Sequence, residues 1–515
     1  MTILDFFPTE FGGRVDQKPR TNQVAVLKQV QDVWGKSDVI VIRAPVGSGK
    51  SPLAQTIAAW ATQDKHTAAI LTHRVSLQEQ YKRDFPTIPT LMGKSRYTCP
   101  GNEYSCADMI DMFGDCNGAG CVYTQAKEAA KAAKVAVMNY HIYTYLPDKR
   151  NAIICDEFHR VFDILSEMYS LKLWAHKDKY PKGMSTAGDV AVWLEGRIKV
   201  LGKEIGRLKP LAKEDKEVAK QLKEATDQQK KFTRLIAGLQ TAPANFFLEH
   251  KKDFYRGQEK DCLQVRPTSL QNLPPILWRS SGIQKIVLMS GTSNEQDIKK
   301  LGLEGMRISY INSANPIPKE RRPVDASWGV NMSWEYQDKN MPVLAERIQT
   351  LAITHIDTKG LVHLTYGMAE KLKRYLKGDR FLWHDNKNRE EVLQRYLESK
   401  EPVVLMACGM SEGLDLAGPE FGWQVIAKVP YPSMADKLIA KWASEDSPWY
   451  NWMTARTIEQ QVGRICRGPD DFGKTYIVDL AFGNIPKKRP GFVQRAHKLF
   501  SKDFLESITW EGIKQ

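Results

Sequence analysis

The segment VIVIRAPVGSGKSPLAQTIAAW (residues 39–60) joins a short β-branched apolar run to a longer apolar-periodic stretch through a glycine-containing loop. The first part predicts a buried strand, and the last part predicts a helix. Glycines allow the intervening backbone to turn tightly and to point its N–H groups at phosphate oxygens, and the positive end of the helix dipole strengthens that attraction. The segment therefore predicts a phosphate-binding loop at a strand–helix junction.

The residues of this loop have distinct expected roles toward ATP. Gly47 and Gly49 supply the turn, and Lys50 would reach the β and γ phosphates. Ser51 would ligate Mg²⁺. Ala44 stands where such loops usually have their first glycine, so the strict motif fails at one position. The strand before the loop and the helix after it support nucleotide binding despite this departure.

The segment IICDEFH (residues 153–159) supplies the acidic residues that ATP hydrolysis needs. An apolar strand that ends in two adjacent carboxylates is costly unless a cation uses them. Asp156 would hold Mg²⁺ through a bound water, and Glu157 would position and deprotonate the water that attacks the γ-phosphate. The alternative is a strand-end turn with two exposed acids, which the presence of the phosphate loop disfavours.

A basic segment in the second half of the chain, QQVGRICR (residues 460–467), completes the candidate catalytic set. Gln460, Arg464 and Arg467 have the spacing i, i+4, i+7, which predicts one helix face. Two arginines directed at a γ-phosphate would stabilise transition-state charge as arginine fingers. On its own this segment is only a basic helix face, and the two motifs above give it the catalytic interpretation.

Short apolar strands alternate with helix patterns in two parts of the chain, which predicts an α/β fold with two parallel-sheet domains. The first alternation includes TAAILT (67–72) and KIVLMS (285–290), and the second includes GLVHLT (360–365) and TYIVDLA (475–481). Residues 189–240 interrupt the first alternation with Lys, Glu, Leu and Ala at helical spacing, which predicts an inserted helical hairpin broken at Pro210. This hairpin is either a solvated charged pair or a nucleic-acid contact.

The charge balance indicates a polyanionic partner. The 515-residue chain carries 74 Lys and Arg against 60 Asp and Glu, a formal net charge of +14, and nucleic acid is the commonest polyanion. The alternative is a basic but inert surface. The sequence contains no run of about 18 apolar residues, so we expect no membrane span. The opening MTILDFFPTEFGG lacks the features of a secretory signal, so we expect a cytoplasmic protein.

Half of the eight cysteines lie within TCPGNEYSCADMIDMFGDCNGAGC (residues 98–121). Cys99, Cys106, Cys116 and Cys121 are separated by six, nine and four residues. Their clustering indicates one metal centre, because structural disulfides are rare in the cytosol. Zinc sites usually show two close cysteine pairs, and the bacterial ferredoxin spacing does not fit either. Spacing therefore leaves an iron–sulfur cluster and zinc equally favoured, with four unrelated buried thiols as the remaining alternative.

These segments, in this order along the chain, resemble the motifs of superfamily 2 helicases, and most closely those of the XPD/DinG family of iron–sulfur-containing helicases. DEFH (156–159) resembles the family's DEAH box, with Phe158 in place of Ala. MSGTS (289–293) departs from the family's usual Thr-Ser-Ala-Thr. The resemblance covers most of the chain. Further matching segments are PRTNQ (19–23), THRVSLQEQ (72–80), NPIPKERRP (315–323) and ACGMSEGLDLAG (407–418).

The resemblance implies two RecA-like motor domains, with two insertions in the first. Residues 93–135 would form an iron–sulfur insertion, in which the four clustered cysteines hold a [4Fe–4S] cluster, and residues 161–245 would form a helical Arch-like insertion. Gln23 would contact the adenine base, and Asp415 would belong to the nucleotide site. The first motor domain would comprise residues 1–92, 136–160 and 246–292, and the second would comprise residues 293–515.

By this resemblance, the chain would be an ATP-dependent DNA helicase that moves 5′ to 3′ along single-stranded DNA and unwinds forked or tailed duplex DNA. The implied cofactors are ATP, Mg²⁺ and the [4Fe–4S] cluster, with zinc as the alternative to the cluster. The alternative function is an ATP-gated nucleic-acid clamp, or a protein-displacing translocase, with little strand separation. RNA is the less favoured substrate. We expect a monomer in a bacterial or viral-host cytoplasm, a nuclear location being left open, with replication or repair proteins as partners.

Overall fold

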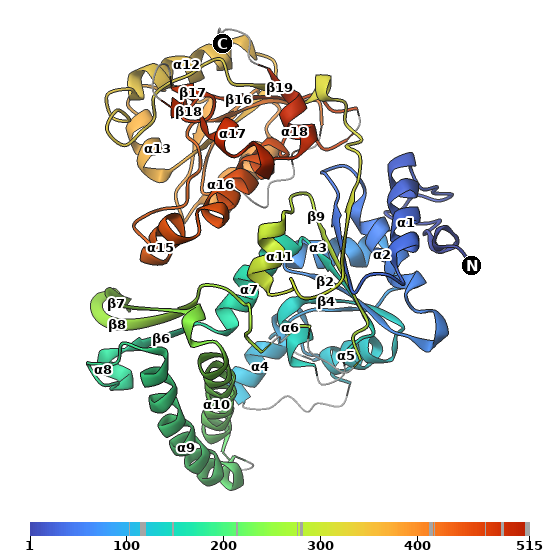
Figure 1. Ribbon diagram of the computed structural model, residues 1–515, viewed down its shortest axis with the longest axis vertical. Helices are drawn as coiled ribbons and strands as arrows, with labels where there is room; N and C mark the ends of the chain where they lie inside the picture. The colour runs from blue at the N-terminus through green and yellow to red at the C-terminus, as the bar shows by residue number, and fades with distance from the viewer. Residues whose placement is uncertain are drawn as a thin grey trace. The chain divides into compact units, whose positions relative to one another are not determined.

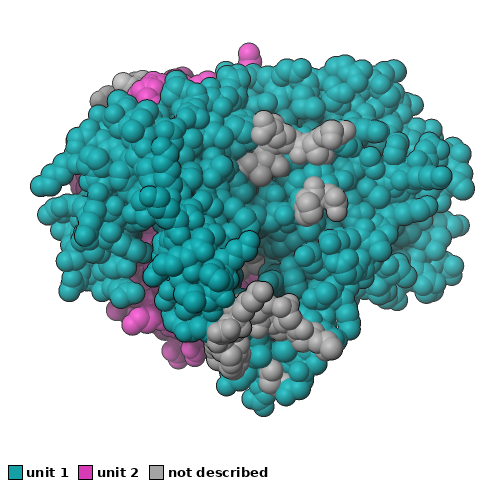
Figure 2. Space-filling view, turned by 90° about the horizontal axis from the view of Figure 1, so that it is seen from below, with its two compact units in different colours: residues 1–43, 49–312 teal, residues 44–48, 313–515 magenta. Residues whose placement is uncertain are grey.

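The computed structural model describes residues 1–101, 103–113, 120–146, 149–212, 215–274, 277–278, 282–410, 416, 418–468, 470–485 and 489–509. The chain divides into two compact units, residues 1–43 with 49–312 and residues 44–48 with 313–515 (Figure 2). In the described part of each unit lies a seven-stranded sheet whose neighbouring strands are all parallel. The expected α/β fold with two RecA-like domains is therefore confirmed.

The first sheet has the strand order β10–β1–β9–β5–β2–β4–β3. Its central strands are buried along their length, which explains why their sequences are continuous apolar runs and do not alternate. Because β1, β9 and β5 are neighbours, the residues that follow them meet at one edge of the sheet. The strands are β1 (Val39–Arg43), β2 (Ala68–Thr72), β3 (Thr90–Leu91), β4 (Val135–Asn139), β5 (Ala152–Asp156), β9 (Lys285–Ser290) and β10 (Ile308–Asn312).

Helices α1, α2 and α3 pack against strands of this first sheet. Helix α2 begins at the phosphate loop, and α3 follows β2, so both place their first turns near the carboxyl edge of the sheet. The described α-helices of this unit outside residues 175–241 are α1 (Thr21–Val33), α2 (Lys50–Trp60), α3 (Val75–Asp84), α4 (Cys106–Phe113), α5 (Val122–Ala132), α6 (Tyr140–Tyr145), α7 (Val161–Met168) and α11 (Glu295–Leu301).

The first unit extends further along the chain than the sequence indicated. Strand β10 pairs with β1 along its whole length, from Ile308 opposite Val39 to Asn312 opposite Arg43. Residues 293–312 therefore belong to the first sheet and not to the second motor domain, whose expected start at residue 293 is too early. The boundary of the compact unit falls after Asn312.

The expected helical hairpin is present as α9 (Ala187–Leu211) and α10 (Lys216–Thr241), which pack side by side (Figure 1). Pro210 stands in the last turn of α9, where its missing N–H and its ring help to end the helix. Trp193 and Phe232 face each other across the hairpin, with their ring centroids 6.2 Å apart. The hairpin thus has an apolar seam between two charged outer faces.

A three-stranded antiparallel sheet extends this insertion beyond residue 245. Strand β8 (Gln258–Pro267) pairs with both β7 (Phe246–Tyr255) and β6 (Leu171–Trp174), while α8 (Ala175–Asp178) follows β6. Residues 246–267 therefore belong with the insertion. The expectation that they belong to the first motor domain is wrong. Arg256 and Gly257, both at positive φ, form the two-residue turn that joins β7 to β8.

The second unit contains the sheet β13–β14–β12–β15–β16–β11–β19, whose central strands β12, β14 and β15 are fully buried. None of the helices in the described ranges is long and apolar enough to cross a membrane. The strands of this sheet are β11 (Val324–Asp325), β12 (Lys359–Leu364), β13 (Phe381–Trp383), β14 (Val404–Cys408), β15 (Phe421–Ile426), β16 (Lys474–Ile477) and β19 (Ile508–Thr509). The remaining elements are α12 (Met341–Thr354), α13 (Tyr366–Leu372), α14 (Arg389–Glu398), α15 (Lys437–Glu445), α16 (Ser447–Val462), α17 (Phe492–Arg495), α18 (Lys502–Ser507) and the pair β17 (Asn484–Ile485) with β18 (Arg489–Pro490).

Candidate active site

The glycine-containing loop lies where the sequence predicted it, between the end of β1 at Arg43 and the start of α2 at Lys50. Gly47 and Gly49 have φ values of 80° and 76°, in the left-handed region that glycine adopts without steric cost. The Ser48 hydroxyl donates to the Pro45 carbonyl oxygen at 2.6 Å, which tightens the turn. The predicted strand–loop–helix unit is therefore confirmed.

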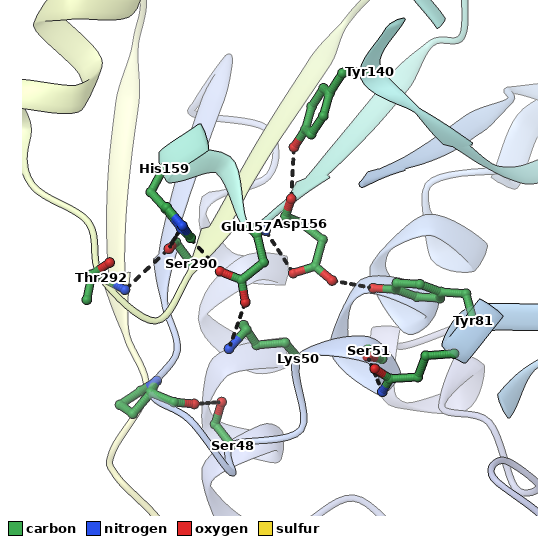
Figure 3. Close-up of polar contacts among 12 residues, drawn as sticks. Ser48, Lys50, Ser51, Tyr81, Tyr140, Asp156, Glu157, His159, Ser290 and Thr292 are labelled. Atoms are coloured by element: carbon green, nitrogen blue, oxygen red, sulfur yellow. Dashed lines mark hydrogen bonds and ion pairs between the residues drawn. The ribbon is translucent and has the colours of Figure 1, made fainter. Parts of the chain in front are cut away.

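The loop lysine contacts the glutamate of the acidic segment (Figure 3). Lys50 Nζ lies 3.5 Å from Glu157 Oε1, and His159 Nδ1 lies 3.2 Å from Glu157 Oε2. Glu157 has left-handed backbone angles (φ 52°, ψ 45°), an uncommon conformation for a side chain of this size. Such backbone conformations concentrate at functional sites, and here the conformation accompanies a carboxylate held between a lysine and a histidine.

Asp156, the last residue of β5, is buried and hydrogen-bonded at every oxygen. Its Oδ1 accepts from the Glu157 backbone N–H at 2.9 Å, and its Oδ2 accepts from the Tyr81 hydroxyl at 3.0 Å. Its backbone carbonyl accepts from the Tyr140 hydroxyl at 2.9 Å. The two tyrosines come from α3 and α6, and they bond Asp156 at its carboxylate and at its backbone carbonyl respectively (Figure 3).

The two adjacent carboxylates have opposite pKa shifts. Burial, together with the neighbouring charge of Glu157, raises the pKa of Asp156 to about 6. Burial also acts to raise the pKa of Glu157, but the charge of Lys50 and the contact with His159 outweigh it and hold that pKa well below its usual range. Two carboxylates thus share one lysine, and a further cation at Asp156 would balance the remaining charge.

The surroundings of Ser51 and Asp156 fit a magnesium ion. Ser51 follows the lysine in the first turn of α2, and its hydroxyl oxygen accepts from Gln80 Nε2 at 3.5 Å. Gln80 and Tyr81 are consecutive residues of α3, so one helix contacts both expected magnesium ligands. Hydroxyl and carboxylate oxygens are the protein ligands that Mg²⁺ prefers beside phosphates.

Gln23, the expected adenine contact, is buried in α1 and bonded to the phosphate loop. Its Oε1 accepts from the Arg20 backbone N–H at 2.9 Å, and its Nε2 donates to the Gly49 carbonyl oxygen at 3.2 Å. A Cβ at Gly49 would lie 2.3 Å from that Nε2, so a larger residue there would displace the Gln23 amide from the loop. In the structure Gln23 therefore supports the loop, and its contact with a base stays a prediction.

A hydrogen-bonded chain links the acidic segment to the end of β9. His159 Nδ1 lies 2.9 Å from Ser290 Oγ, which also accepts from the Thr292 backbone N–H at 3.3 Å (Figure 3). Ser290 and Thr292 belong to MSGTS, the segment that departs from the family's usual Thr-Ser-Ala-Thr. Their nearness follows from the strand order, since β9 lies between β1 and β5.

Sequence reasoning missed Tyr81 and Tyr140. Tyr140 directly follows β4, whose carboxyl end lies at the same edge of the sheet as that of β5, and this placement was the available signal. Tyr81 follows the segment 72–80 that resembled a helicase motif, but no pattern in the sequence directs its hydroxyl toward an acid. Both hydroxyls bond to Asp156.

The three predicted catalytic residues of the second unit are not all on a helix. Helix α16 ends at Val462, so Gln460 is helical while Arg464 and Arg467 follow the helix end. The prediction of one helix face across all three is wrong. Gly463 is a poor helix former at the break, and the Asp471 carboxylate accepts from the backbone N–H of Arg467 at 2.8 Å, which stabilises a turn in place of further helix. Asp415, the remaining expected nucleotide contact, lies outside the described residues.

Two of the clustered cysteines lie together. Cys106 and Cys121 are buried in one small cluster with Ile110. Hydrogen bonds, chiefly from Thr124 and to a smaller extent from Cys106, lower the pKa of the Cys121 thiol. A thiol that ionises more readily is a better metal ligand, so this pair fits a metal centre.

The other two cysteines of the set are only partly placed. Cys99 lies in a short turn, where its backbone N–H donates to the Tyr104 carbonyl oxygen at 2.9 Å, and Thr98 bridges to Ser105. Cys116 lies outside the described residues. Among the residues that the structure does describe, no three His, Cys, Asp or Glu side chains gather as a metal site. The four-cysteine centre therefore stays a prediction.

Two family models and several solved helicase structures are similar to this chain. A family model described as the helicase C-terminal domain matches residues 353–493, and the model of the type III restriction enzyme res subunit matches residues 16–178. A solved XPD helicase is similar with a TM-score of 0.60 and 16% identity, over 90% of this chain and 96% of that chain. Xpd4 of S. tokodaii is similar with a TM-score of 0.53 and 16% identity, over 95% of this chain and 100% of that chain. At such identity the likeness shows the fold.

Proposed function

We propose that the chain is an ATP-driven DNA helicase of the XPD/DinG-like type, which its fold and its two family matches support. The observation that carries the proposal is the contact of Lys50 in the phosphate loop with Glu157, next to the buried Asp156. A lysine, a partly exposed carboxylate and a buried carboxylate at a glycine turn form the arrangement that phosphoanhydride hydrolysis requires.

The residues of the phosphate loop and the acidic segment would act on ATP as follows. The backbone of Gly47 and Gly49 would cradle the phosphates, and Lys50 would neutralise the β and γ oxygens. Ser51 and Asp156 would hold Mg²⁺, which offsets charge on the phosphates. Glu157 has a depressed pKa and is therefore ionised at neutral pH, so it can orient the attacking water and accept its proton.

Residues of the second unit carry the other roles that the sequence predicted. We propose Gln460, Arg464 and Arg467 as the groups that stabilise transition-state charge, with the arginines as arginine fingers. We propose Asp415 as a nucleotide contact and Gln23 as the adenine contact. Support for these roles comes from the order of the motifs along the chain and from the match of the helicase C-terminal model over residues 353–493.

The nucleic-acid substrate is proposed on charge and resemblance. A net charge of +14 favours a polyanion, and the XPD/DinG resemblance favours single-stranded DNA, 5′ to 3′ movement and a monomer. The motor would be interrupted by an iron–sulfur insertion at residues 93–135 and by an Arch-like insertion that begins at residue 161. Replication or repair proteins are the proposed partners.

The cysteine segment would hold a [4Fe–4S] cluster through Cys99, Cys106, Cys116 and Cys121. When bound, the cluster would serve as a covalent staple for a small insertion that has little core of its own. Of the described residues, Cys106, Ile110 and Cys121 form that core, with Tyr97 and Tyr123 packed against it. Zinc is the alternative occupant.

A fluorescent forked duplex tests the proposal. We expect release of the labelled strand only with ATP and Mg²⁺, and only from a fork that has a 5′ single-stranded tail. ATP hydrolysis that DNA stimulates without strand release would instead support a clamp or a protein-displacing translocase. Absence of any nucleic-acid-stimulated hydrolysis, on DNA or on RNA, would overturn the proposed function.

A further inference from the structure

Helix α3 contacts both proposed magnesium ligands through two consecutive residues. Tyr81 donates its hydroxyl to Asp156 Oδ2 at 3.0 Å, and Gln80 Nε2 lies 3.5 Å from Ser51 Oγ. Both residues come from the last two turns of α3, and neither belongs to the phosphate loop or to the acidic segment. The magnesium ligands therefore have a common support outside the two segments that supply them.

The Tyr81 hydroxyl is a fixed hydrogen-bond donor. The side chain is 1% exposed, so no bulk water reaches it. The hydroxyl lies 3.0 Å from Asp156 Oδ2. An ionised carboxylate can only accept a hydrogen bond, so the phenol is the donor in this contact.

The Asp156 carboxylate is thereby held at both oxygens. The Glu157 backbone N–H bonds Oδ1 at 2.9 Å, and the Tyr81 hydroxyl bonds Oδ2 at 3.0 Å. Each oxygen keeps a second lone pair in a direction that these two bonds determine. Partners of this kind, which bond a metal ligand without touching the metal, set the orientation of the ligand and tune its affinity for the ion.

We propose that Tyr81 is a positioning residue that orients the Asp156 carboxylate toward the magnesium of bound ATP and thereby sets the magnesium requirement of the site. This inference rests on the proposed function, because it assumes that Asp156 serves a nucleotide-bound Mg²⁺. Loss of the hydroxyl leaves Oδ2 without its donor and lets the carboxylate rotate about its Cβ–Cγ bond. The ion would then bind more weakly, although no atom that touches it has changed.

The structure supplies a matched control in Tyr140. This residue is also a fully buried tyrosine, and its hydroxyl also bonds Asp156, at 2.9 Å. Its acceptor, however, is the backbone carbonyl of Asp156 and not the carboxylate. Tyr81→Phe and Tyr140→Phe therefore delete the same atom from equally buried rings next to the same residue, and only the first deletion changes the carboxylate.

The experiment measures binding of a fluorescent ATP analogue by the full chain at increasing MgCl₂ concentration. We expect Tyr81→Phe to raise the half-saturating Mg²⁺ concentration about tenfold, as loss of a partner of a metal ligand typically does. We expect Tyr140→Phe to leave that concentration unchanged. Thermal melting of both variants without nucleotide measures the structural cost of each deletion separately from the magnesium effect.

The possible results are distinct. Equal magnesium dependence in wild type and Tyr81→Phe, or an equal shift in both variants, would overturn the role of Tyr81 while leaving the proposed function intact. No magnesium-dependent nucleotide binding by the wild-type chain would overturn the proposed function itself, and this inference with it. If Tyr81→Phe fails to fold, Gln80→Leu, on the partly exposed neighbouring position, must show the shift for the support by α3 to stand.

Discussion

Lys50 and Glu157 form an ion pair between the phosphate loop and the acidic segment, with 3.5 Å between Nζ and Oε1. The lysine begins α2 and the glutamate follows β5, so the pair joins segments that are 107 positions apart, from 50 to 157. The charge of Lys50 outweighs the effect of burial and lowers the pKa of Glu157, which favours the ionised carboxylate. When ATP binds, its γ-phosphate would replace Glu157 as the ion-pair partner of Lys50. Glu157 could then accept a proton from water.

Glu157→Gln should abolish hydrolysis while preserving nucleotide binding. The amide keeps the shape of the side chain but cannot accept the proton of the attacking water, and loss of a general base typically costs 10²–10⁴-fold in rate, so we expect a fall in kcat of at least about 100-fold. Steady-state ATP hydrolysis and binding of a fluorescent ATP analogue measure the two effects. Glu167→Gln, an exposed acid on α7, is the control. Normal turnover by Glu157→Gln would exclude it as the base.

Lys50→Met should reduce nucleotide affinity more than it reduces stability. The substitution removes the charge proposed to meet the β and γ phosphates, and a charged hydrogen bond of this type contributes about 1.5–3 kcal/mol, or roughly 10- to 150-fold in Kd. Titration with the fluorescent ATP analogue checks the affinity. Lys28→Met changes the same atoms on the exposed face of α1 and should bind normally. If both variants bind equally well, Lys50 has no role in phosphate binding.

Gly49→Ala should disturb the loop for two independent reasons. The left-handed φ of 76° costs a non-glycine residue about 1–2 kcal/mol, and the added Cβ would lie 2.3 Å from Gln23 Nε2. We expect a lower melting temperature and weaker nucleotide binding. Gly188→Ala is the control, since Gly188 stands in the first turn of α9 and a Cβ there meets only Thr186 Oγ1, at 3.7 Å. Unchanged binding by Gly49→Ala would contradict the loop assignment.

The sequence was most informative where strands are buried on both faces. Strands β1, β5 and β9 each contain four consecutive apolar residues with polar residues only at the strand ends, as a central parallel strand requires, and they could be located from the sequence alone. Strand β7 was missed because it pairs with β8 at the edge of a small sheet, and its sequence FFLEHKKDFY carries charges along the hairpin. Pairing of that kind depends on tertiary contacts that leave no periodic signal.

The residues of the candidate site also differ in whether the sequence alone could predict them. Lys50 and Glu157 come from short motifs whose chemistry is local, so their roles could be predicted before their contact was seen. Tyr81 contacts Asp156 only because α3 packs beside β5, and this neighbour relationship is a property of the strand order. The end of α16 was predictable in principle, because Gly463 marks the break before Arg464.

Stability of the second unit should fall as the pH falls from about 6.5 toward 4. Burial lowers the pKa of His363 to about 4, and this effect outweighs its hydrogen bond to Gln424. The unfolded chain binds a proton near pH 6.5 and the folded chain does not, so protonation favours unfolding across that window. The difference corresponds to about 3 kcal/mol at its limit.

His363→Gln isolates this effect. The variant should lose stability less steeply than the wild type between pH 6.5 and 4.5, as measured by urea unfolding at a series of pH values. His497→Gln replaces an exposed histidine of the same unit and should keep the wild-type slope. Parallel curves for wild type and His363→Gln would show that the buried imidazole does not control the acid sensitivity.

Anaerobically purified protein should be coloured if the clustered cysteines hold iron and sulfide. Thiolate-to-iron charge transfer gives a broad absorption near about 400 nm, which zinc does not give. Cys106→Ser should remove the absorption and lower the iron content, because Cys106 and Cys121 share one buried cluster. Cys262→Ser is the matched control, since Cys262 is equally buried but lies in β8, outside residues 98–121. A colourless protein with stoichiometric zinc would replace the cluster by the zinc alternative, and a protein free of both metals would leave the four thiols as unrelated residues.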